Sequence, residues 1–153
     1  MAFAFVAGCA PGSELVGRWS TDLRSTFAAA NAAQYASFEL RVTFGEFDTY
    51  LLETRAVAAA AATNGADCTT VLVSRGGTWS VSTTSGVNTL ETTPPLTGTA
   101  ERFGCRNRAE NFTPQPTSGA ATWTLASGTY RVSGNSLVYS PRGGSSALTF
   151  TRV

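Results

Sequence analysis

The chain of 153 residues contains no histidine, and its 11 basic residues are all arginine, so lysine is absent as well. Without histidine, no Ser-His-Asp or Cys-His nucleophile can be assembled, and zinc sites of the HExxH type are excluded. Without lysine, there is neither a Schiff-base amine nor a phosphate-binding loop of the Walker type. Catalysis would have to rest on carboxylates, hydroxyls, tyrosine or arginine alone.

Charge is scarce too, because charged side chains make up 14% of the chain and leave a net charge of +1. Such a surface lacks the basic face that nucleic-acid binding requires. Four acidic residues are scattered along the chain and form no recognisable two-carboxylate catalytic pair: Glu39, Asp48, Glu53 and Glu91. We therefore predict one domain that is not an enzyme, has no cofactor or metal and has no nucleic-acid partner.

Cysteine occurs only three times, and the first lies near the start of the chain. The residues Val6-Ala7-Gly8-Cys9 resemble the bacterial lipobox, in which small residues precede a cysteine that becomes lipidated. The apolar stretch before Cys9 is shorter than the roughly 20 residues that span a bilayer, and it lacks the basic start of a secretory signal. The resemblance implies a truncated lipoprotein signal at 1–8 and a lipid-anchored tether at 9–14. The alternative is an apolar N-terminal strand in which Cys9 is buried.

The odd number of cysteines bears on the cellular location of the protein. If Cys9 carries lipid, Cys68 and Cys105 remain as an even pair, which can form a disulfide in an oxidising compartment. We therefore expect an exported protein of the bacterial cell envelope, anchored in the outer membrane because Ala10 follows the lipidated cysteine. The alternative is a cytosolic protein with two buried free thiols.

Beyond Gly12 the hydrophobic pattern has a period of two, which is typical of half-buried strands. It predicts strands at 37–44, 50–55, 68–73, 78–81, 88–92, 129–133, 136–139 and 147–152. Turns are expected at 45–48, 75–77 and 85–87, and Gly134-Asn135 predicts a tight hairpin. An alanine-rich stretch at 26–36 predicts a short helix. The total of roughly eight to ten antiparallel strands indicates an all-β sandwich or barrel, and the similar segments 77–82 and 128–133 favour an up-and-down barrel.

Gly17-Arg18-Trp19 opens the first strand of the predicted barrel, and the chain ends in Thr149-Phe150-Thr151-Arg152-Val153. These two ends resemble those of the lipocalins and the wider calycin group. The resemblance implies a lipocalin-like barrel over 15–153, closed at one end by Gly17, Trp19 and Arg152 through a cation–π contact. It also implies that 22–36 covers the open end as a lid. The chain lacks the C-terminal helix and the mid-chain Thr-Asp-Tyr of typical lipocalins.

This resemblance implies a membrane-anchored lipoprotein that binds a small apolar or amphipathic molecule inside the barrel. By alternation, the residues expected to line the ligand are Phe38, Leu40, Val42, Phe44, Tyr50 and Leu52. The alternative is a structural or protein-interaction envelope lipoprotein with a filled barrel and no small ligand. In that reading Arg102, Arg106 and Arg108 could hold a carboxylate or phosphate of a partner. The sequence predicts neither the ligand's identity nor the oligomeric state.

Overall fold

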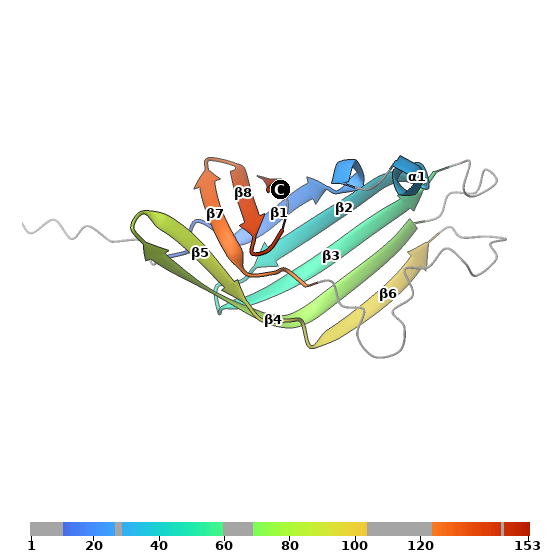
Figure 1. Ribbon diagram of the computed structural model, residues 1–153. Helices are drawn as coiled ribbons and strands as arrows, with labels where there is room; N and C mark the ends of the chain where they lie inside the picture. Colours follow the sequence, from blue (N-terminus) through green and yellow to red (C-terminus); the bar gives the residue numbers. More distant parts are fainter. Residues whose placement is uncertain (1–10, 27–28, 60–68, 104–123, 145) are drawn as a thin grey trace, which may run out of the picture.

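The computed structural model describes residues 11–26, 29–59, 69–103, 124–144 and 146–153. In these residues nine strands form one antiparallel sheet, and pairing of β3 with β4 closes eight of them into a ring (Figure 1). The predicted all-β, up-and-down barrel is thereby confirmed. The strands are β1 (Gly17–Asp22), β2 (Tyr35–Phe44), β3 (Thr49–Ala58), β4 (Thr69–Thr84), β5 (Val87–Thr92), β6 (Thr97–Phe103), β7 (Gly128–Ser133), β8 (Ser136–Pro141) and β9 (Leu148–Arg152). Two helical turns, η1 (Arg24–Thr26) and α1 (Ala29–Ala32), join β1 to β2.

The ninth strand arises because β4 is long. β6 pairs with its first half and β5 with its second half, both antiparallel. β5 and β6 thus follow one another along β4 as a single strand interrupted at Pro94 and Pro95, whose nitrogens cannot donate to the ladder. The turn predicted at 75–77 is wrong. β4 continues through it, and the positive φ of Gly76 absorbs an irregularity in the pairing with β3.

The ring is closed over only part of its height. β9 pairs with β1 only at Trp19 and Ser20, and β7 pairs with β5 only at Asn88, Thr89 and Leu90. β2, β3, the first half of β4 and β6 continue past the short β7 and β8 as a curved sheet (Figure 1). We call residues 35–40, 54–58, 69–74 and β6 the extension, and the rest of the barrel the closed ring.

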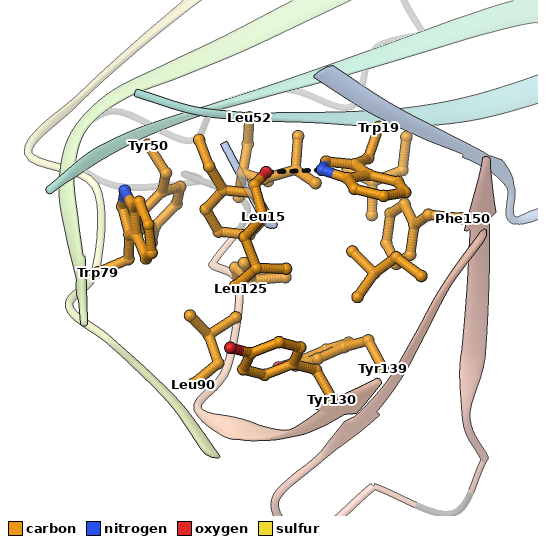
Figure 2. Packing of buried hydrophobic residues seen from close by; sticks show 14 of the residues in the cluster. Leu15, Trp19, Tyr50, Leu52, Trp79, Leu90, Leu125, Tyr130, Tyr139 and Phe150 are labelled. Atoms are coloured by element: carbon orange, nitrogen blue, oxygen red, sulfur yellow. Dashed lines mark hydrogen bonds between the residues drawn. The ribbon is translucent and has the colours of Figure 1, made fainter. Parts of the chain in front are cut away.

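The core lies inside the closed ring and continues along the concave face of the extension. Inward residues alternate with half-exposed ones along β2 and β3, as strands with one buried face require. Residues from two connecting segments, Leu15 and Leu125, also lie inside the ring, between its walls (Figure 2). The core comprises Leu15, Trp19, Leu23, Phe38, Leu40, Val42, Phe44, Tyr50, Leu52, Ala56, Trp79, Leu90, Leu125, Tyr130, Leu137, Tyr139 and Phe150.

The helix predicted over 26–36 is wrong for most of its length. Among the described residues of this stretch, the α-helix covers only Ala29–Ala32, and β2 already begins at Tyr35. Isolated helices of a few turns are marginal even when rich in alanine. Pairing of Tyr35 with Ala58 and the edge-to-face contact between Tyr35 and Phe38, at 5.1 Å, fix this segment as strand instead. In the described part of the chain, no helix is long and apolar enough to cross a membrane.

Candidate functional site

The first and last strands of the barrel meet through Trp19 and Arg152. The guanidinium carbon of Arg152 lies 4.2 Å from the centre of the Trp19 ring. Its Nη1 donates to the carbonyl of Val16 at 2.9 Å and its Nη2 to that of Glu14 at 2.6 Å. The buried indole in turn donates from Nε1 to the carbonyl of Leu15 at 2.7 Å. One arginine thus binds an aromatic face and two carbonyls, a geometry suited to its planar fork.

Gly17 belongs to the same closure. Its φ is +125°, and a β-carbon there would lie 2.9 Å from Nη1 of Arg152. Only glycine satisfies both the conformation and the close approach. The spacing Gly-x-Trp therefore has a physical basis here, because the glycine makes room for the arginine that covers the tryptophan.

The segment before β1 closes this end of the ring from within. Residues 11–15 form turns, Leu15 is fully buried, and a β-carbon on Gly12 would lie 3.0 Å from the ring of Trp79. The hydroxyl of Tyr130 donates to Oε1 of Glu14 at 2.8 Å. Burial and the adjacent Glu14 carboxylate both raise the pKa of the Tyr130 hydroxyl. The periodicity of the sequence gives no sign of this plug, because a lone leucine in a turn belongs to no repeat.

A second plug enters from the opposite end of the ring, from residues 124–127 ahead of β7. Leu125 is buried, its carbonyl accepts from Oγ1 of Thr92 at 2.5 Å, and the carbonyl of Ala126 accepts from the hydroxyl of Tyr139. Burial, with a smaller contribution from nearby Tyr50, raises the pKa of Tyr139 to about 12. The ring is therefore filled between Leu15 and Leu125 (Figure 2).

Four of the six residues predicted to line a ligand lie in or beside this filled ring. Phe44 meets Trp79 edge-to-face at 5.3 Å. A β-carbon on Gly77 would lie 2.4 Å from the ring of Tyr50, whose hydroxyl donates to the carbonyl of Thr93 at 2.6 Å. Val42 and Leu52 are neighbours across β2 and β3 and are also buried. These four residues belong to the packed core of the ring.

The other two predicted residues, Phe38 and Leu40, lie on the concave face of the extension. The inward residues that accompany them on β3 and β4 are small or polar except for Leu72: Thr54, Ala56, Ala58, Leu72 and Ser74. Thr54 and Ser74 are the buried polar residues of the described chain, at 4% and 1% exposure. Leu52 faces Ser74 and Thr54 faces Leu72 across the strands, so the two hydroxyl residues are diagonal neighbours. Sequence reasoning missed both, since hydroxyl residues also populate outer faces.

The predicted lid segment is fixed to the end of β2. Arg24 donates from Nε to the carbonyl of Ala32 at 3.3 Å and from Nη1 to that of Ala36 at 3.2 Å. Leu23 is buried, and its backbone nitrogen donates to the carbonyl of Phe38 at 2.8 Å. The described part of this segment therefore adjoins the concave face at the Phe38 end of the extension.

The outer wall carries a polar groove of about 430 Å³ where β9 diverges from β1. It is lined by Ser20, Thr21, Asp22, Ser37, Glu39, Thr149, Thr151 and Val153. Burial tends to raise the pKa of Glu39, but hydrogen bonds from Arg41 and Ser20 outweigh it and lower the pKa overall. Among the described residues no group of three or more cysteine or acidic residues could hold a metal ion.

Several predicted residues lie outside the described residues: the lipidation candidate Cys9, the disulfide candidates Cys68 and Cys105, and two of the three arginines considered for anion binding, Arg106 and Arg108. Arg102 lies in β6.

Comparisons with protein-family models, curated proteins and solved structures find no match to this chain. The barrel and the closure formed by Gly17, Trp19 and Arg152 are consistent with a lipocalin-like fold.

Proposed function

We propose that this protein binds one small, apolar or amphipathic molecule on the concave face of the extension. The observation that carries the proposal is a gradient of side-chain size along the inward face of β3. Its inward residues change from Tyr50 and Leu52 in the closed ring to threonine and alanine in the extension. Small inward residues on a strand that continues past its opposite wall are suited to packing against a guest molecule.

The chemistry of this face supports an uncharged guest. None of the buried side chains of the described chain is charged. Burying a charged ligand group without a partner is costly, so the face favours apolar molecules. The plugs at Leu15 and Leu125 keep the ligand out of the closed ring, which limits it to the length of the extension.

We also propose that the protein lies in the cell envelope and that it catalyses no reaction. With Cys9 lipidated, the protein would be an envelope lipoprotein that holds its ligand near a membrane surface. It would act as a binder and not as an enzyme, because the chain lacks histidine and lysine, and no carboxylate is among the buried residues of the part of the chain that the structure describes.

A second candidate function is a structural or protein-interaction lipoprotein with a filled barrel. One observation favours it: the inward residues of the extension, from Phe38 to Ser74, are at most 5% exposed. A fully packed interior of this kind would leave the outer face and the loops to do the binding.

Titration with N-phenyl-1-naphthylamine, whose fluorescence rises in apolar sites, separates the two candidates. We expect saturable binding to the wild-type protein and its loss in Ala56→Trp, which fills the concave face. The matched control is Val57→Trp, one residue along on the outer side of β3, which should bind as the wild type does. Native mass spectrometry of the purified protein should in addition reveal a co-purified small molecule. A wild type that binds no probe and has only its apo mass would support the filled barrel.

A further inference from the structure

The concave face carries one feature that packing alone does not explain. The Oγ atom of Ser74 is buried, and no hydrogen-bond partner for it exists among the described residues. Its residue is 1% exposed, and its nearest neighbours across the strands are Leu52 on β3 and Gly98 on β6. A buried hydroxyl without a partner loses its hydrogen bonds to water and gains none in return.

The second buried polar residue of the described chain, Thr54, lies diagonally beside Ser74. The two hydroxyl residues therefore form one polar spot on a face that is otherwise made of leucine, alanine and phenylalanine. Ligand pockets have this composition: a mainly apolar lining with a few polar groups that orient the guest. Alanine or valine at position 74 would fit the apolar surroundings without leaving an unpaired group.

We infer that Ser74, assisted by Thr54, selects a ligand that carries one uncharged oxygen, such as an alcohol or a ketone, on an otherwise apolar body. This inference rests on the proposed function and names the ligand class for the same site. A hydroxyl can donate to a ketone oxygen, or exchange donor and acceptor roles with an alcohol. A carboxylate is disfavoured, because the buried residues that β2, β3 and β4 contribute to this face include no arginine to neutralise it.

The test is displacement of bound N-phenyl-1-naphthylamine by decanol and by decanoate at neutral pH, two ligands with equal chain length and different head groups. We expect the wild type to bind decanol about 10-fold or more tightly than decanoate, because the carboxylate would be buried without a partner. Ser74→Ala should weaken decanol binding about 3- to 10-fold, the usual effect of one hydrogen bond, and should leave the affinity for the naphthylamine unchanged.

Two controls separate binding from folding. Ser80→Ala removes an exposed hydroxyl from the same strand and should change neither affinity. Ser74→Ala should also keep or raise the melting temperature, because it removes an unpaired buried group. A variant that is as stable as the wild type and yet binds decanol more weakly assigns Ser74 to the ligand.

Failure of the proposed function and failure of the inference about Ser74 give different results. If the wild type binds none of the three probes, the proposed function is wrong and this inference falls with it. If the probes bind but decanol and decanoate compete equally, or Ser74→Ala leaves the affinity for decanol unchanged, the concave face binds ligands without the selection proposed here. Equal weakening of the naphthylamine and decanol in Ser74→Ala would also overturn the inference, since it would mean that Ser74 acts through the shape of the face.

Discussion

At the scale of single residues, Arg152 joins segments at the two ends of the described chain. It covers Trp19 and donates to the carbonyls of Glu14 and Val16. Lysine has one compact ammonium group and cannot reproduce the stacked, forked geometry. We expect Arg152→Lys to lower the free energy of unfolding by about 1–2 kcal/mol, and Trp19→Ala by about 3–5 kcal/mol as a large core truncation. Urea unfolding of both variants and of the double variant measures the effects and their coupling.

The two effects should be strongly non-additive, because the groups touch. The matched control is Arg18→Lys, an exposed arginine on β1, the strand that carries Trp19, which should stay within about 0.5 kcal/mol of the wild type. Simple additivity in the double-mutant cycle would mean that the contact contributes nothing to closure.

The sequence could predict this contact but not its surroundings. Gly17, Trp19 and Arg152 stand at positions that a known pattern identifies. Leu15, Leu125 and Ser74 belong to no periodic or spaced pattern that marks their roles. Their roles depend on which strands surround them, and only the folded arrangement of the closed ring and the extension determines that.

Among the structural elements, the segment 124–127 acts as the plug of the ring on the side facing the extension. Leu125→Ala should destabilise the protein by about 2–5 kcal/mol, because the ring walls cannot collapse onto the resulting cavity. Leu96→Ala is the control: it removes a leucine that is 82% exposed, and it should change stability by no more than about 0.5 kcal/mol. Thermal unfolding of the two variants provides the measurement, and equal melting temperatures would show that Leu125 does not belong to the core.

Tyr139, which holds this plug, makes the stability of the folded protein decrease at alkaline pH. The pKa of Tyr139 is raised to about 12 by burial and by Tyr50, whereas an unfolded tyrosine ionises near pH 10. The stabilisation is therefore complete below about pH 10 and is lost as the pH rises toward 12. Urea midpoints measured from pH 8 to 11 should fall above pH 10, and less steeply in Tyr139→Phe. Parallel pH profiles for the two proteins would contradict this assignment.

Strand β4 shows where element prediction failed and why. Arg75-Gly76-Gly77 has the composition of a turn, yet β3 pairs with β4 on both sides of it, while the other neighbour, β6, ends its pairing at Arg75. Glycine provides a positive φ to a β-bulge as readily as to a turn, so local composition cannot separate the two. Here the choice depends on Tyr50, whose ring occupies the space above Gly77.

For the molecule as a whole, the expected disulfide stays a prediction. The β4–β6 ladder ends at the pair Thr69 and Phe103, one residue after Cys68 and two before Cys105 in the sequence. A bond between these cysteines would contribute about 4 kcal/mol on the chain-entropy model. Non-reducing peptide mapping should find the two cysteines joined, and reduction should lower the melting temperature by several degrees. Two free thiols in the folded protein from an oxidising compartment would rule out the bond.

The architecture of the whole molecule was the most predictable level. Alternating hydrophobicity and turn residues suffice for an antiparallel all-β chain, and the similar segments 77–82 and 128–133 favoured the barrel over the sandwich. The partial closure was not predictable, because it arises from a difference in strand length. β7, β8 and β9 are short and pair over few residues, whereas β2, β3 and β4 continue past them. The candidate binding face follows from that difference in length.

The closure by Arg152 also has a consequence for the order of events during synthesis. The arginine donates to carbonyls 136 and 138 residues earlier in the chain, so its contacts join β9 to the segment that precedes β1. β2, β3 and β4 can pair while translation continues, but β1 keeps an unpaired edge until β9 has left the ribosome. Until then the Trp19 face and the edge of β1 are exposed to other chains. Release of the last strand is thus the step that converts an open, aggregation-prone sheet into a closed barrel.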